Sequence, residues 1–91
     1  MTKKLSKEEK TSYRRGFILC MSEISSYCIE EVANRIRMYE VYCPAIASGY
    51  RDGYRNWQGE VGEFENEDLA YSLRKRYEGY WGQSDFNHPE A

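Results

Sequence analysis

Apolar side chains recur every three or four residues through the first half of the chain. The run consists of Tyr13, Phe17, Met21, Ile24, Cys28, Val32, Ile36 and Tyr39. Because a helix turns about 100° per residue, these positions form one continuous apolar stripe. Ser6-Lys7-Glu8-Glu9 has the form of a capping box, so the helix should begin at about Lys7. The pattern predicts one long helix to about Tyr42, and leaves open whether it bends or breaks at Ser25-Ser26.

A second helix is predicted to follow at once. Cys43-Pro44 ends the first helix, because proline disfavours helical geometry in the residue before it and suits the first helical position. The second helix should run from this proline to Gln58, with an inward face formed by Ile46, Tyr50, Gly53 and Trp57. The segment 59–65 contains two glycines and is strongly acidic, which predicts a loop.

A third helix completes the predicted fold. Asn66 can cap it, Gly82 can end it, and its buried stripe would be Leu69, Leu73, Tyr77 and Tyr80. No segment shows the sustained alternation of apolar and polar residues that is typical of a strand. The sequence therefore predicts one all-α domain over residues 1–91, a small helical bundle of about three helices whose first helix is long. The termini at 1–6 and 83–91 are predicted to be frayed.

Three of the predicted helical segments place a glycine directly before an aromatic residue. They are Tyr13-Arg14-Arg15-Gly16-Phe17, Tyr50-Arg51-Asp52-Gly53-Tyr54 and Arg76-Tyr77-Glu78-Gly79-Tyr80. Glycine inside a helix costs about 0.5–1 kcal/mol relative to alanine, so another interaction should compensate. We favour close helix packing, with Ala45, Gly49 and Gly53 as a smooth ridge on the second helix. The alternative is that the same ridge forms a docking groove for a partner.

The second predicted helix also concentrates the residue types that dominate protein interfaces, namely tyrosine, tryptophan and arginine. The candidate partner-binding residues are Tyr50, Arg51, Tyr54, Arg55 and Trp57. Tyr50 and Trp57 also belong to the predicted inward face. The exposed part of this surface should therefore be the rim formed by Arg51 and Arg55.

Charge is unevenly distributed along the chain, although the net charge is only −2. This net charge argues against a general DNA or membrane binder, since both need positive charge. Basic residues near Tyr13 could still bind RNA or single-stranded nucleic acid, where bases stack on aromatic rings and phosphates meet Lys or Arg. The candidates are Lys7, Lys10, Arg14 and Arg15, or alternatively Arg74, Lys75 and Arg76 near Tyr77. The competing interpretation, which we favour, is an ordinary solvated helix face.

Catalytic and metal-binding motifs are missing from the sequence. The single histidine, His88, lies beside a proline in the predicted tail, where it is poorly placed to act as a fixed base. Cys20 and Cys28 lie on the apolar stripe, and neither C-x-x-C nor H-x-x-x-H occurs. We therefore predict a non-enzymatic protein without a metal or a cofactor.

Cysteine usage and hydropathy predict where the protein resides. Three cysteines, an odd number without paired spacing, suit a reducing compartment. No run approaches the roughly 18 consecutive apolar residues of a membrane span, and no signal peptide precedes the first helix. The sequence predicts a cytoplasmic protein with no membrane contact.

The segment Ser48-Gly49-Tyr50-Arg51-Asp52-Gly53-Tyr54-Arg55-Asn56-Trp57, together with the short chain and its basic start, resembles small bacteriophage accessory proteins. The resemblance covers about ten residues and the general character of the chain. It implies a protein that binds and disables a host enzyme or a defence system in the host cytoplasm, frequently as a small oligomer.

These observations predict a non-enzymatic protein that binds another protein and modulates or inhibits it. One alternative is an RNA or nucleic-acid binding module that uses the basic and aromatic residues. A second is a nucleotide-sequestering protein in which aromatic rings from two subunits stack on a base. The long apolar stripe needs more cover than two shorter helices supply, so we expect self-association, most simply as a two-fold dimer.

Overall fold

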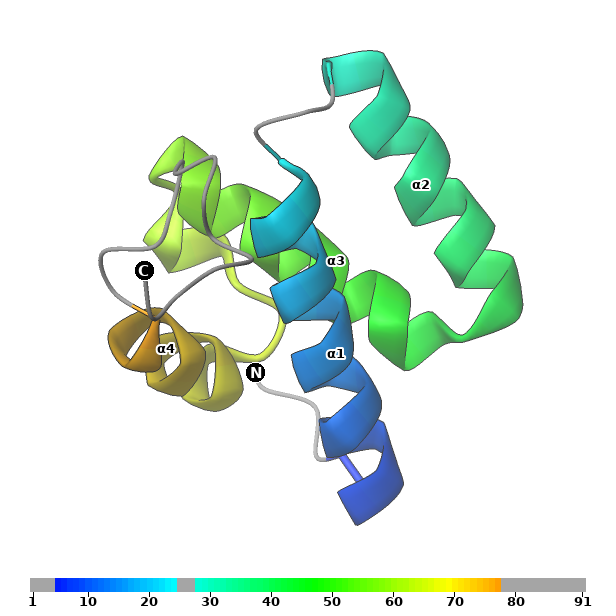
Figure 1. Ribbon diagram of the computed structural model, residues 1–91. Coiled ribbons are helices and arrows are strands. Elements are labelled where there is room, and N and C mark those ends of the chain that lie inside the picture. The colour runs from blue at the N-terminus through cyan, green and yellow to red at the C-terminus, as the bar shows by residue number, and fades with distance from the viewer. Residues whose placement is uncertain (1–4, 25–27, 78–91) are drawn as a thin grey trace, which may run out of the picture.

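The computed structural model describes residues 5–24 and 28–77, and within them the chain is all α-helical with no strand (Figure 1). The elements are α1 (Lys7–Glu23), α2 (Ile29–Tyr42), α3 (Pro44–Gln58), the short 3-10 helix η1 (Val61–Glu63) and α4 (Glu67–Arg76). The predicted fold class is confirmed. The described part of the chain forms four α-helices where about three were expected.

The start of α1 follows from the capping box. The Ser6 hydroxyl accepts a hydrogen bond from the Glu9 backbone N–H at 3.1 Å, and the Glu9 carboxylate accepts one from the Ser6 backbone N–H at 2.9 Å. Two N–H groups that have no partner within the helix are thereby satisfied. The predicted start at Lys7 is confirmed, and Leu5 just before it packs against the core.

The long first helix of the sequence prediction is in fact two helices. α1 ends at Glu23, and α2 begins after Cys28, whose backbone is extended. The Cys28 backbone N–H donates to the Glu31 carboxylate at 3.1 Å, so a new helix start is built here. Cys28 itself is exposed, although it was placed on the buried stripe. The predicted weak point at Ser25-Ser26 lies outside the described residues.

The break allows α1 and α2 to pack against the same helix, α3. Figure 1 shows α2 and α4 on opposite sides of α1. Two clusters of apolar side chains fill the spaces between the helices. The first, toward α4, consists of Tyr13, Phe17, Met21, Phe64, Ala70 and Leu73. The second, toward α2, consists of Cys20, Ile24, Val32 and Tyr50.

Glycines on both helices bring α1 and α3 into backbone contact. A Cβ atom built on Gly16 would lie 2.0 Å from the Ile46 carbonyl oxygen, and one built on Gly49 would lie 1.9 Å from the Tyr13 carbonyl oxygen. Gly16 therefore faces Ile46, three residues before Gly49, and Gly49 faces Tyr13, three residues before Gly16. Side chains larger than hydrogen do not fit at either position without separating the helices. The interpretation of the glycines as close-packing residues is confirmed for Gly16 and Gly49, while Gly79 lies outside the described residues.

The ends of α3 and the start of α4 also follow the sequence pattern. α3 spans the predicted range, and Gly59 ends it with a φ of +83°, a left-handed conformation that favours glycine. The Asn66 side chain accepts from the Leu69 backbone N–H at 3.1 Å and caps α4 as predicted. The described part of α4 ends at Arg76, so the predicted end at Gly82 lies outside the described residues.

Candidate functional site

Tyr50, the first of the predicted partner-binding residues, lies in the interior. It has no exposed surface, and its ring centroid is 5.5 Å from that of Tyr39. Its hydroxyl donates to the Glu23 carboxylate at 2.8 Å. Burial, with this hydrogen bond, raises the pKa of Tyr50 well above its usual range. Tyr50 therefore holds α1, α2 and α3 together and is unavailable to a partner.

Arg51 and Arg55, the predicted exposed rim, are instead bound to carboxylates of the same chain. Arg51 donates to Glu65 at 3.0 Å and to Glu40 at 2.6 Å, while Arg55 donates to Glu65 at 3.1 Å. Only 27% of each arginine side chain is exposed. These contacts tie α3 to the end of α2 and to the segment before α4. The two arginines are primarily structural.

Glu65 is the acid on which both arginines converge. Burial alone would raise the pKa of Glu65, but hydrogen bonds from Arg51, Ser48 and Arg55 outweigh burial and lower it to about 2. The Ser48 hydroxyl donates to the Glu65 carboxylate at 2.7 Å. Glu65 therefore remains ionised at any ordinary pH and cannot serve as an acid in catalysis.

Asp52 has no exposed surface and is hydrogen-bonded on both carboxylate oxygens. It accepts from the Tyr13 hydroxyl, from the backbone N–H groups of Glu65 and Asn66 at 2.8–3.0 Å, and from Arg55 at 2.8 Å. A buried carboxylate is stable only when it is paired in this way. Sequence reasoning missed this role. The signal was an acid on the apolar side of a helix, next to Gly53.

The remaining two predicted residues, Tyr54 and Trp57, differ in their exposure to solvent. Tyr54 is half-buried against the cluster beneath α2. Trp57 was expected on the inward face, but 40% of it is exposed. A helical wheel gives the direction of a side chain but does not show how far the neighbouring helices extend. Because Trp57 lies in the last turn of α3, its inward direction does not ensure that another helix covers it. The predicted partner-binding set is thus divided between the core, an internal ion-pair network and the surface.

A second surface, which the sequence analysis did not single out, lies at the end of α2. Val41 is 90% exposed, Tyr42 is 81% exposed and Met38 is 47% exposed. Residues three and four apart are neighbours on a helix, so Met38 touches the same patch as the other two. We name Met38, Val41 and Tyr42 the apolar corner. The sequence signal was present, because Val41 and Tyr42 fall off the stripe formed by Val32, Ile36 and Tyr39.

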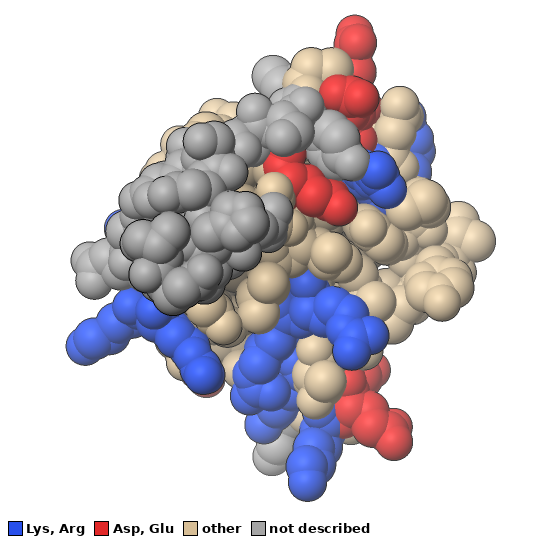
Figure 2. All heavy atoms as spheres, in the orientation of Figure 1, with Lys and Arg blue, Asp and Glu red and all other residues tan. Residues whose placement is uncertain are grey.

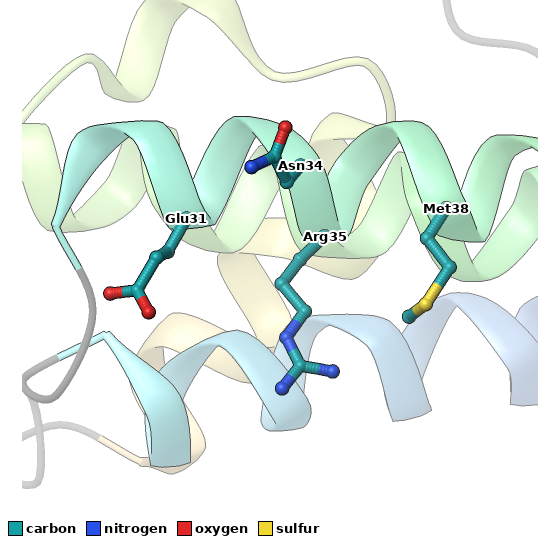
Figure 3. A pocket seen from close by; sticks show the side chains of 4 residues that line it. All are labelled: Glu31, Asn34, Arg35 and Met38. Atoms are coloured by element: carbon teal, nitrogen blue, oxygen red, sulfur yellow. The ribbon is translucent and has the colours of Figure 1, made fainter.

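A shallow depression of about 240 Å³ extends the apolar corner along α2. Figure 3 shows Glu31, Arg35 and Met38 pointing to the same side of the helix. The depression is lined by these residues and Asn34, all from one helix. It contains no aromatic ring on which a nucleotide base could stack, so it offers no support for nucleotide sequestration.

The basic residues predicted as nucleic-acid contacts, on α1 and on α4, are exposed. Figure 2 shows Lys and Arg side chains gathered over the lower part of this face, over α1 and α4. The exposed bases of these helices are Lys7, Lys10, Arg14, Arg15, Arg74, Lys75 and Arg76. We name these seven residues the basic face. None of them forms an ion pair with another described residue.

The described residues contain no cluster that could hold a metal ion, and Cys20 lacks the exposure of a reactive thiol. No group of three or more His, Cys, Asp or Glu side chains in this part of the chain is placed to hold a metal ion. Cys20 is buried, and burial together with the nearby Glu23 carboxylate raises the pKa of its thiol. His88 lies outside the described residues.

None of the described helices combines the length and apolar character that crossing a membrane requires.

Comparison with known proteins does not place the chain in a family. No protein-family model, no curated protein and no solved structure matches it. A function is therefore inferred from the geometry of the two exposed surfaces, the apolar corner and the basic face.

Proposed function

We propose that this chain acts by binding another protein, and that the apolar corner is its main contact surface. The exposure of Val41 and Tyr42 is the observation that carries the proposal. Burying an apolar side chain of this size gains about 1.5–3 kcal/mol, and tyrosine is among the residues that dominate interface energies. Two adjacent side chains left in water are a source of binding energy that folding has not used.

A backbone hydrogen bond and an ion pair also anchor the apolar corner at the junction of α2 and α3. The Cys43 backbone N–H donates to the Tyr39 carbonyl oxygen at 2.6 Å, and Pro44 begins α3 directly afterwards. The ion pair between Arg51 and Glu40 joins the end of α2 to α3. A partner that binds here orders little additional backbone, which lowers the entropic cost of association.

Affinity purification with matched variants tests the proposal. The tagged wild-type chain, Val41→Ser/Tyr42→Ser and Trp57→Ser would be compared in nuclease-treated lysate of the source cells. We expect one stoichiometric protein with the wild type, its loss with the double variant, and its retention with Trp57→Ser. Circular dichroism controls for folding. Loss with Trp57→Ser alone would instead locate the contact on α3, where the sequence analysis placed it.

The proposal extends to modulation or inhibition of the partner, which the resemblance to small bacteriophage accessory proteins suggests. If the captured partner is an enzyme, its activity should fall when the wild-type chain is added and should be unaffected by Val41→Ser/Tyr42→Ser. Unchanged activity with the bound wild-type chain would contradict inhibition while leaving binding intact.

Self-association remains a prediction, but its original reason no longer applies. Tyr13, Phe17, Cys20 and Met21 are covered within a single chain, each at 1% exposure or less. Light scattering of the wild type and of Val41→Ser/Tyr42→Ser measures whether the chain self-associates and whether the apolar corner is required. A dimer that the double variant converts to a monomer would make a second copy of the chain the occupant of the apolar corner.

A further inference from the structure

We propose that the basic face of α1 and α4 is a second binding surface, and that its ligand is the phosphate backbone of single-stranded nucleic acid. The surface shares no residue with the apolar corner. The two proposals therefore succeed or fail independently.

The absence of ion pairs between the basic face and other described residues is the first argument. The structural arginines of α3, Arg51 and Arg55, are both paired with the Glu65 carboxylate. The seven residues of the basic face have no such carboxylate among the described residues. Their charge is directed to solvent, where it is available to an anionic ligand.

Helix stabilisation does not account for the basic residues of α1. Cations favour the C-terminal turn of a helix, which explains why Arg74, Lys75 and Arg76 end α4. Lys7 and Lys10, however, lie in the first turn of α1, where the helix dipole disfavours positive charge. Their position costs helix stability, so another interaction should favour it.

The spacing of the bases suits a linear polyanion. Lys7, Lys10 and Arg14 follow one another at intervals of three and four residues, so they form one row along α1. From Lys7 to Arg14 the row extends about 10 Å at 1.5 Å per residue. A strand of nucleic acid presents one negative charge per nucleotide and can follow such a row.

Exposed aromatic surface on α4 favours nucleic acid over an acidic protein. Tyr71 is 45% exposed and lies three and four residues before Arg74 and Lys75, on the same side of the helix. Arg76 lies over the Tyr77 ring, 5.8 Å from its centroid. Bases stack on tyrosine rings and on arginine planes without regard to sequence, which is typical of single-strand binding.

Fluorescence anisotropy with labelled oligouridylate and oligothymidylate of about 20 nucleotides tests the proposal. With about five phosphate contacts, affinity should fall about 100-fold between 50 and 200 mM salt, since each contact contributes about 0.7 to the slope of log K against log salt. Lys10→Ala/Arg14→Ala and Arg74→Ala/Lys75→Ala should each reduce that slope by about 1.4. Arg37→Ala, an exposed base on α2, should leave it unchanged.

Three results would overturn the proposal. If neither oligonucleotide binds saturably at low salt, the basic face is not a nucleic-acid binding site. Equal binding of polyglutamate of similar length would reassign the basic face to acidic proteins. A loss of affinity with Arg37→Ala as large as that with Lys10→Ala/Arg14→Ala would show that net charge, and not this face, attracts the ligand.

Discussion

The contact between α1 and α3 predicts that alanine at Gly49 will destabilise the protein strongly. A Cβ atom there would lie 1.9 Å from the Tyr13 carbonyl oxygen, whereas real Cβ contacts are essentially never shorter than 3.0 Å. The helices must therefore separate by at least about 1 Å, and a gap of this size forfeits a quarter to a half of each dispersion contact along the seam. The obstacle is backbone, so no change of rotamer can relieve it.

The magnitude follows from two opposing effects. Over-packing a core costs about 1–3 kcal/mol and sometimes more, and a rigid backbone obstacle belongs at the upper end of that range or beyond it. Alanine offsets this by about 1 kcal/mol through its higher helix propensity. We expect a net loss of about 2–3 kcal/mol for Gly49→Ala, and the same for Gly16→Ala. The double variant should lose less than the sum, because helices that have separated once accommodate the second methyl group.

Urea denaturation followed by circular dichroism measures these free energies of unfolding. Gly62→Ala is the matched control, because nothing lies within 4 Å of its Cβ position, and it should change stability by less than about 0.5 kcal/mol. Gly53→Ala should cost less than Gly49→Ala, since its Cβ meets the Cys20 side chain at 2.9 Å. A Gly49→Ala protein as stable as the Gly62→Ala control would refute the backbone contact.

Three further predictions concern the ion-pair network and the apolar corner. Asp52→Ala should cost about 3–5 kcal/mol in urea denaturation, because the buried Tyr13 hydroxyl, two backbone N–H groups and Arg55 lose the acceptor that Asp52 provides; a loss below about 1 kcal/mol would contradict the network. Since the pKa of Glu65 is about 2 in the folded chain against an ordinary value of 4.5, its contribution is complete above pH 4.5 and is lost as the pH falls toward 2. After discounting for solvent screening this amounts to roughly 1–2 kcal/mol, and a Glu65→Gln protein whose stability falls as steeply over that range would exclude Glu65 as the cause. Tyr42→Ser should change the free energy of unfolding by less than about 0.5 kcal/mol, and a larger loss would mean that Tyr42 contributes to the core.

The helices were predictable where local chemistry decides them. The capping box at Ser6, the proline at position 44 and the cap at Asn66 each act within four residues, and the structure has all three. The start of α2 was missed because its N-cap residue, Cys28, is not a residue type that commonly caps helices. The close contact at Gly49 was also predictable, since mid-helix glycine needs a compensating interaction.

The candidate site was less predictable because exposure depends on what covers each residue. Arg51 and Arg55 were expected at a binding rim, but Glu65 reaches them from a segment ten or more residues away in the sequence. Periodicity places a side chain on one side of a helix and does not reveal a partner from another element. The apolar corner was missed for the same reason. The position of Val41 off the apolar stripe does not show whether another part of the chain covers it.

Site-specific photocrosslinking tests most directly whether the apolar corner contacts a partner protein. A photoreactive phenylalanine derivative at the Tyr42 position, and in a control protein at the Tyr71 position, would be activated in the source cells. Both positions are exposed tyrosines, but Tyr71 lies on α4. We predict a single crosslinked protein from the Tyr42 position and none of it from the Tyr71 position. Crosslinking of that protein from Tyr71 alone, or no crosslink from either position, would contradict the claim.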